Sequence, residues 1–118
     1  MMKLRLASLL VSLLLSGVAQ AQENPANYPS RPIRIVVGNA AGGGTDTIAR
    51  LIGPKLSEKL GQPVVVENKP GGNNIIAVQT VTKAPPDGYT LLAGTMGMLT
   101  INPALYPSLP YDTLRRSE

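Results

Sequence analysis

Three short apolar runs, separated by polar and glycine-rich stretches, dominate the middle of the chain. Residues 33–37 are rich in β-branched side chains, residues 63–67 contain three consecutive valines, and residues 89–93 carry a Thr-Leu-Leu sequence. Continuous apolar runs of this length are typical of parallel strands that are covered from both sides. The pattern therefore predicts three strands that are buried on both faces of a sheet.

The segments between these runs have helical spacing. Residues 45–60 carry apolar side chains at intervals of three or four and are followed by Gly61, which predicts an amphipathic helix with a glycine stop. Pro54 lacks a backbone donor, so we expect a kink or a split there. Residues 75–83 are predicted to form a second helix. The alternation of strands and helices predicts an α/β fold with a layered, mostly parallel sheet and right-handed crossovers.

The first 21 residues follow another pattern. A start with Lys3 and Arg5 leads into an apolar stretch at residues 6–18 and then into Ala-Gln-Ala at residues 19–21. A charged start, an apolar middle too short for a membrane span and a small-residue cleavage site are typical of a secretory signal peptide. We expect cleavage after Ala21 and export. Residues 22–32, polar and rich in Pro and Asn, are predicted to be an extended leader, and residues 33–118 are left for one domain.

Composition excludes several functions. The formal charge of +4 includes two residues of the signal peptide, so the mature chain carries about +2. Its basic residues are dispersed and only 3% of the chain is aromatic, which argues against nucleic acid binding. The chain has no Cys and no His, so disulfides, the usual zinc sites and Ser-His or Cys-His nucleophile pairs are excluded. We expect no enzyme, no metal and no cofactor.

A glycine-rich stretch after the first predicted strand is the leading candidate for a ligand site. It comprises Ala41, Gly42, Gly43, Gly44, Thr45 and Asp46. Glycine amides can approach a ligand closely, and the start of the next helix favours an anion. The spacing of Gly38 and Gly43 is that of a phosphate-binding P-loop, but Gly44 takes the place of its lysine, which argues against a nucleotide. A tight strand-to-helix turn explains the glycines equally well, and Asp46 fits helix-dipole compensation better than ligand contact.

Two further loops follow the other predicted strands. In an open parallel sheet, ligands bind beyond the carboxyl ends of the strands, where the strand order changes direction. The candidates there are Gly72, Asn73 and Asn74 after the second strand, and Gly94, Thr95, Met96 and Gly97 after the third. The two asparagines favour turn chemistry over ligand contact. Thr95 suits a ligand site and a simple turn equally, whereas Met96 and Met98 favour core or interface packing.

Five ordered motifs together resemble one known family. They are YPSRPI at residues 28–33, AGGGTD at 41–46, LGQPVVVENKPG at 60–71, PDGYTLL at 86–92 and INPALY at 101–106. The sequence resembles the Bug family of receptors for tripartite tricarboxylate transporters from about residue 28 to residue 112. Several motifs in the same order make a chance similarity very improbable.

The resemblance implies a two-lobed periplasmic binding protein of the type II-like fold, with this chain forming part of the first lobe. It also implies a periplasmic location, a small carboxylate ligand and uptake through the membrane subunits of a tripartite tricarboxylate transporter. Members of the family hold a ligand carboxylate with backbone amides, hydroxyls and ordered waters. By motif position these groups correspond to residues 41–46, 71–75 and 94–98.

The sequence departs from the family pattern in three places. Gly38 and Asn39 replace a proline and an aromatic residue, and Ile75 stands where an asparagine usually opens the second helix, which leaves Asn74 one residue early. The similarity stops after Asp112, so residues 33–118 are expected to be an incomplete N-terminal lobe, truncated before the second lobe. Closure around a ligand is not expected from one side of a cleft, and binding by this chain alone stays open. The alternatives are a small exported interaction module or, less favoured, an enzyme that uses the glycine-rich loop.

Overall fold

A parallel three-stranded sheet organises the computed structural model, which describes residues 25–113. The strands are β1 (Ile33–Val37), β2 (Val64–Asn68) and β3 (Thr90–Ala93), in the order β2-β1-β3. Neighbouring strands run parallel, with Val37 of β1 opposite Asn68 on one side and Ala93 on the other. The α/β fold with a parallel sheet that the sequence predicts is confirmed.

The first helix, α2 (Gly44–Leu60), runs as one continuous element through Pro54. Of the kink or split expected at Pro54, the split is therefore wrong. Gly53 precedes the proline and has no Cβ to collide with its ring, so the helical conformation is accessible at this position. The helix ends as predicted at Gly61, which has a left-handed φ of 69° and donates its backbone N–H to the carbonyl of Ser57.

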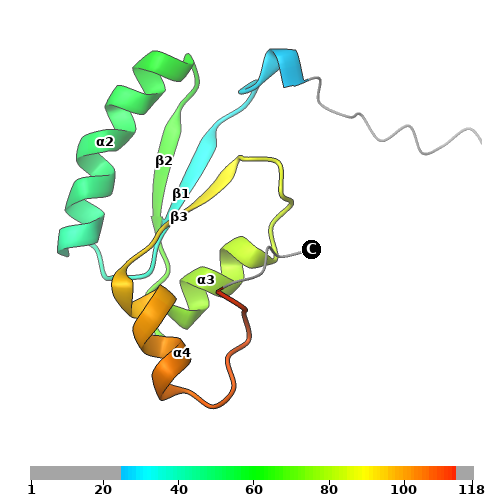
Figure 1. Cartoon of the computed structure of the whole chain (residues 1–118). Helices are drawn as coiled ribbons and strands as arrows, with labels where there is room; N and C mark the ends of the chain where they lie inside the picture. Colours follow the sequence, from blue (N-terminus) through cyan, green and yellow to red (C-terminus); the bar gives the residue numbers. More distant parts are fainter. Residues whose placement is uncertain (1–24, 114–118) are drawn as a thin grey trace, which may run out of the picture.

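The remaining helical elements are short. They are η1 (Pro25–Asn27), η2 (Gly72–Asn74), α3 (Ile75–Thr82), the π-helical stretch η3 (Gly97–Ile101) and α4 (Asn102–Leu105). The second predicted helix is confirmed as α3, while the helical stretch from η3 into α4 is not predicted from the sequence. In Figure 1, α3 and α4 lie beside the end of the sheet where β1 leads into α2.

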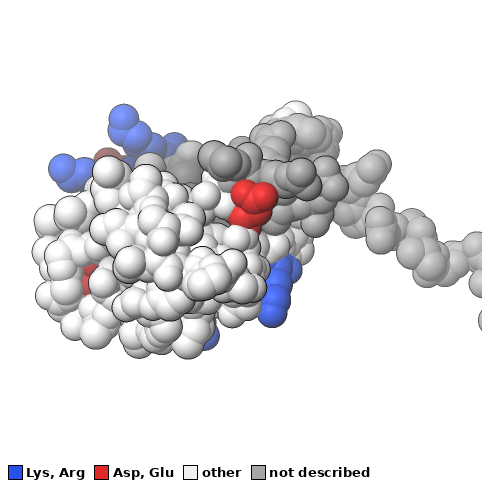
Figure 2. Space-filling view, turned by 60° about the horizontal axis from the view of Figure 1, so that its bottom comes forward, with Lys and Arg blue, Asp and Glu red and all other residues white. Residues whose placement is uncertain are grey.

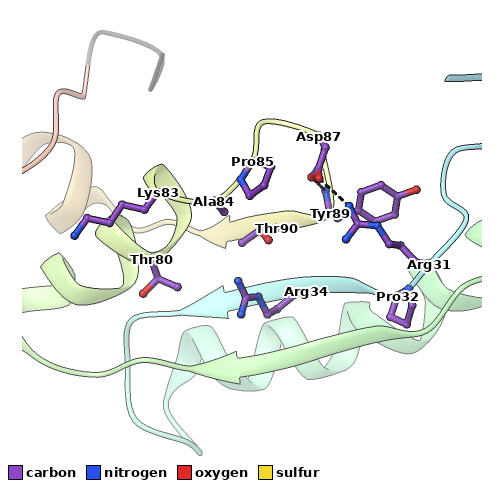
Figure 3. A pocket seen from close by; sticks show the side chains of 10 residues that line it. All are labelled: Arg31, Pro32, Arg34, Thr80, Lys83, Ala84, Pro85, Asp87, Tyr89 and Thr90. Carbon is purple, nitrogen blue, oxygen red and sulfur yellow. Dashed lines mark hydrogen bonds and ion pairs between the residues drawn. The ribbon is translucent and has the colours of Figure 1, made fainter. Parts of the chain in front are cut away.

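The two longest helices cover opposite faces of the sheet. Ile35 and Val37 of β1 pack with Ala49 of α2 in a core to which Val64 and Val66 of β2 contribute. Successive strand residues point to opposite faces, so the fully buried Val36 points toward the α3 side. Figure 3 shows α2 and α3 on the two sides of the strands.

Burial differs between the central strand and the two edge strands. Four of the five residues of β1 are buried, whereas β2 and β3 contain no fully buried residue. Val65 of β2 and Leu91 of β3 are 52% and 40% exposed. Burial on both faces is therefore confirmed for β1 and wrong for the two edges. An apolar run indicates which residues tolerate burial and does not specify what covers them.

The start of the described chain is tied to the turn before β3. The Tyr28 hydroxyl donates to the Gly88 carbonyl over 2.8 Å, and the rings of Tyr28 and Tyr89 meet edge to face at 5.0 Å. Tyr89 is buried and accepts the Ser30 backbone N–H at its hydroxyl. These contacts join two of the motifs noted above. One 3-10 turn, η1, lies within the predicted leader.

The predicted signal peptide at residues 1–21 lies outside the described residues, as does the chain after residue 113. Between residues 25 and 113, none of the helices combines the length and the apolar character that crossing a bilayer demands.

Candidate functional site

Three loops converge at the carboxyl edge of the sheet. The last residues of the strands are neighbours, since Val37 is paired with Asn68 and with Ala93. The chain leaves β1 through α2 to reach β2 on one side, and then passes through α3 to β3 on the other side. The strand order thus changes direction at β1, which is where ligands bind in open α/β sheets. The structure brings all three predicted candidate loops to this edge.

Asp46 holds the first loop in place. Asp46 is 2% exposed, and its carboxylate accepts the Gly42 backbone N–H at 2.8 Å, the Arg50 Nε–H at 3.0 Å and the Asn68 side-chain amide at 2.9 Å. The hydrogen bond from Arg50, followed by those from Gly42 and Asn68, lowers the pKa of Asp46 to about 2. The carboxylate is therefore ionised and fully engaged, and it folds the glycine loop back onto α2.

The first turn of α2 presents free backbone donors. The first N–H groups of a helix have no partner within it, and here these belong to Gly44, Thr45 and Asp46. Thr47 is the first residue of the helix whose backbone N–H donates to a preceding carbonyl, that of Gly43 at 2.9 Å. Gly43, at the N-cap, has no side chain that could accept a hydrogen bond from the first turn. Gly44 is exposed and a Cβ built on it would meet nothing within 4 Å, so the approach to the start of the helix is open at this residue, whereas Asp46 is buried. Such a terminus suits an anion.

The second loop has an unusual backbone. Gly71, Gly72, Asn73 and Asn74 all have positive φ angles, of 126°, 54°, 51° and 70°. Asparagine tolerates the left-handed region better than most residues, so Asn73 and Asn74 suit the tight turn found here. The Asn73 carbonyl accepts the side-chain amide of Asn102 at 2.8 Å, and the Asn73 side-chain amide donates to the Tyr106 hydroxyl.

Gly38 is in contact with the second and third loops. A Cβ added to Gly38 would lie 2.6 Å from the Asn74 Oδ1 atom and 2.7 Å from the Met98 Cε atom. Only glycine fits between these side chains. Gly38 departs from the family pattern for a structural reason, because Asn74 occupies the space that a larger residue at position 38 would need.

The third loop places its two methionines differently. Met98 is fully buried, as predicted for core packing, whereas Met96 is 73% exposed and does not belong to the core. The Thr95 carbonyl accepts the Met98 backbone N–H at 3.1 Å. Gly94 and Thr95 lie between the end of β3 and η3, and Gly97 is the first residue of η3. The third loop is therefore anchored through Met98.

Two polar side chains that position the loops are missed by the sequence reasoning. Asn68 donates to the Asn39 carbonyl at 3.0 Å as well as to Asp46, and it accepts from Arg50 at 2.9 Å. Asn102 is 3% exposed and bonds both Asn73 and Tyr111. Asn68 and Asn102 both stand inside the motifs that carry the family resemblance. A polar residue next to apolar ones in such a motif is the signal that could have identified them.

The loop edge displays few charged groups. Figure 2, which brings this end of the molecule forward, shows a largely uncharged described surface, with Lys and Arg side chains at its margins and Asp or Glu side chains exposed on the same face. Within residues 25–113, no three Asp or Glu side chains come close enough to share a metal ion. The groups available to a ligand here are therefore backbone amides, hydroxyls and side-chain amides.

Comparison with known proteins gives consistent relatives. The family model for the tripartite tricarboxylate transporter family receptor matches residues 48–117. A UPF0065 protein of Bordetella pertussis is 47% identical over 100 residues, which cover 83% of this chain. Protein BugT of the same organism is 40% identical over 100 residues, which cover 84% of this chain. The chain spans 31% and 30% of the length of these two relatives.

Solved structures show the same relationship. Rpa4515 of Rhodopseudomonas palustris, determined with adipate, has a TM-score of 0.70 at 42% identity, covering 73% of this chain and 29% of the neighbour. MatC of the same organism, with bound malate, gives the same four values. A protein described as a periplasmic transporter has a TM-score of 0.71 at 49% identity. The match covers 74% of this chain and 29% of that protein. The described fold is therefore found as part of larger periplasmic binding proteins.

Proposed function

Because the chain belongs to the receptor family of tripartite tricarboxylate transporters, we propose that it binds a small carboxylate in the periplasm for uptake by such a transporter. The family consists of solute-binding receptors and not of enzymes. Two structural neighbours were determined with dicarboxylates, adipate and malate. The observation that carries the proposal is the uncapped first turn of α2, open to solvent at the switch point of the sheet.

A ligand carboxylate is proposed to accept the free N–H groups of Gly44 and Thr45, with the hydroxyls of Thr45 and Thr95 beside it. The partial positive charge of the helix N-terminus favours an anion. Ala41, Gly42 and Gly43 shape the first loop, while Gly72, Asn73 and Asn74 border it on one side and Gly94, Met96 and Gly97 on the other. Asp46 acts on this site by holding the loop, because its oxygens are already engaged.

We also propose that the protein is exported by the predicted signal peptide, which is cleaved after Ala21, and that it contacts the membrane subunits of the transporter. The curated relatives are about three times as long as this chain. In the two-lobed arrangement that the sequence predicts, the described loops would form one side of the cleft. We therefore expect the chain alone to bind in the millimolar range and not in the micromolar range of a closed cleft.

One pair of variants at Gly44 tests the proposed site. Gly44→Pro removes the N–H donor at the first helical position, where proline is well tolerated, and the extended backbone of Gly43 suits a following proline. Gly44→Ala keeps the donor and adds a methyl group to open space. Losing a hydrogen bond to a charged group costs about 1.5–3 kcal/mol. We expect Gly44→Pro to weaken binding by about tenfold or more and Gly44→Ala to bind like the wild type.

The measurement is a site-resolved NMR titration of the full chain with malate, adipate and citrate. Shifts of the Gly44, Thr45 and Thr95 amides that saturate and that Gly44→Pro weakens would support the proposal. Equal affinity of the two Gly44 variants would contradict it, because the N–H would then have no role. Micromolar affinity of the isolated chain would overturn the expectation that one side of the cleft binds weakly.

A small exported interaction module is a second candidate, favoured by one apolar groove. A cavity of about 390 Å³ lies between α2 and β3, and Ile48, Ile52 and Leu91 on its walls are 58%, 47% and 40% exposed. Exposed apolar surface of this kind marks interaction sites. Sedimentation of the full chain over a range of concentrations tests this function. Association that increases with concentration would support this function, and a monomer at all concentrations would contradict it.

A further inference from the structure

A second pocket lies at the amino edge of the sheet, opposite the three loops. We call it the edge pocket. Its volume is about 520 Å³, within the range of small-molecule sites. Its polar walls come from Arg31, Arg34 and Thr90 near the strand starts and from Thr80 and Lys83 at the end of α3. Figure 3 shows Arg31, Arg34, Thr80 and Thr90 around one opening between α3 and the strands, while the Lys83 side chain at the rim extends away from Arg34.

Arg34 and Thr90 form the floor of the edge pocket. The two residues are paired in the register of β1 and β3, so their side chains leave the sheet next to each other on the same face. Arg34 donates from Nη1 to Glu67 over 3.1 Å, while its Nε and Nη2 groups donate to no residue within 25–113. The Thr90 hydroxyl also has no hydrogen-bond partner in this range. Free donors therefore point into the pocket.

Arg31 forms one wall, and its position is fixed. Its guanidinium group lies 3.9 Å above the Tyr89 ring and pairs with Asp87 at 2.8 Å. The other carboxylate oxygen of Asp87 accepts the Tyr89 backbone N–H at 3.0 Å. Asp87, the one carboxylate of the pocket lining, therefore already has two partners, and the positive charge of Arg31 offsets its negative charge.

Lys83 adds a further cation at the rim. In the described part of the chain no carboxylate pairs with it, in contrast to Arg31, Arg34 and Lys69. The lining thus carries three cations against one carboxylate. Glu67 lies outside the lining and shares its charge between Arg34 and Lys69. The pocket has a positive balance and unused donors.

We propose that the edge pocket is a second anion-binding site, which takes a small oxyanion, either phosphate or a carboxylate. The guanidinium of Arg34 and the hydroxyl of Thr90 contact its oxygens, and Lys83 adds electrostatic attraction. Arginine suits such a ligand because its planar N–H groups match two oxygens at once. The site is separate from the glycine loop, because it lies at the opposite ends of β1 and β3.

Site-resolved NMR titrations of the full chain with inorganic phosphate and with succinate, at constant ionic strength, test this site. Saturable shifts of the Arg34, Lys83 and Thr90 amides are expected, and the probe that binds more tightly identifies the preferred oxyanion. No saturable shift around the edge pocket with either probe would overturn the proposal. Shifts confined to the Gly44 and Thr95 amides would also overturn it, while supporting the carboxylate site of the proposed function.

Variants separate specific binding from general charge attraction. Lys83→Gln is expected to weaken binding about threefold, and Arg34→Gln about tenfold. Lys55→Gln removes the same charge from an exposed position on α2 and should leave the affinity unchanged. Equal losses in Lys83→Gln and Lys55→Gln would overturn the proposal, since only net charge would then matter. Gly44→Pro should not alter binding at the edge pocket.

Discussion

At the scale of single residues, buried and half-buried polar side chains define the geometry of the loop edge. Asp46 joins the glycine loop to α2, Asn68 joins that loop to the end of β2, and Asn102 joins η2 to the start of α4. Each buried polar group that loses its partner costs free energy. The loops are therefore held by a connected set of hydrogen bonds, and each member can be tested separately.

Gly38→Ala should destabilise the protein and displace the second loop. The added Cβ would lie 2.6–2.7 Å from the Asn74 and Met98 side chains, closer than packed atoms allow. Overpacking of this kind typically costs about 1–3 kcal/mol. Urea denaturation measures the loss, and Gly44→Ala, with open space around its Cβ, is the matched control. An unchanged midpoint for Gly38→Ala would show that Asn74 and Met98 move aside freely.

Asn102→Ala should also reduce stability. It removes the donor to the Asn73 carbonyl at 2.8 Å and the contact with the Tyr111 hydroxyl at 3.3 Å, at a site that is 3% exposed. Leaving buried partners unsatisfied costs about 1–3 kcal/mol. Urea denaturation gives the change, and the amide shifts of Asn73 and Asn74 should report a loosened second loop. Loss of stability without any shift at these two residues would contradict the positioning role.

At the scale of elements, local sequence predicts the secondary structure well where a single residue decides it. Gly61 ends α2 because it adopts a left-handed φ of 69°, and the β-branched run of β1 forms the central strand. The pattern wrongly predicts a split of the helix at Pro54. A rule that treats each residue alone omits the fact that Gly53, just before the proline, has no Cβ to collide with its ring. The pattern fails also for the stretch from η3 into α4, which is helical but is not predicted as a helix.

Pro54→Ala should stabilise α2. The alanine restores a backbone donor to the Arg50 carbonyl and removes the ring from the helix interior, and it lies at an exposed position. Proline in a helix interior costs up to about 3 kcal/mol relative to alanine, so we expect a gain of about 1–3 kcal/mol in the free energy of unfolding. Thermal unfolding measures it. Lys55→Ala, one residue further on, is the control and should change little.

At the scale of the whole molecule, the site depends on contacts that the sequence does not reveal. The predicted loops lie at one edge because the strands are parallel, and the first loop lies between the other two because the strand order is β2-β1-β3. This order is a property of the assembled sheet. Asn102 and Asn73 are 29 positions apart, as are Asn68 and Asn39. The sequence therefore indicates which loops are candidates, while the side chains that join them emerge only from the fold.

The carboxylates make the stability of the whole molecule depend on acid pH. The pKa of Asp46 is lowered to about 2 by its hydrogen bonds, first of all from Arg50. The pKa of Glu67 is lowered chiefly by the hydrogen bond from Lys69, and that of Asp87 chiefly by the Tyr89 backbone N–H. Below their ordinary values, 4.5 for Glu and 3.8 for Asp, the unfolded chain binds protons that the folded chain does not. Stability then rises with pH.

We therefore expect full stability above about pH 5 and a progressive loss from there toward pH 2. Urea midpoints at pH 7, 4 and 3 measure this dependence for the wild type and for Asp46→Asn. The variant lacks the carboxylate with the most strongly lowered pKa, so the difference between the two proteins should be largest at pH 7 and should shrink as the pH falls. A difference that is the same at every pH would mean that the charge of Asp46 does not contribute, and that its amide replacement merely disturbs the packing of the glycine loop.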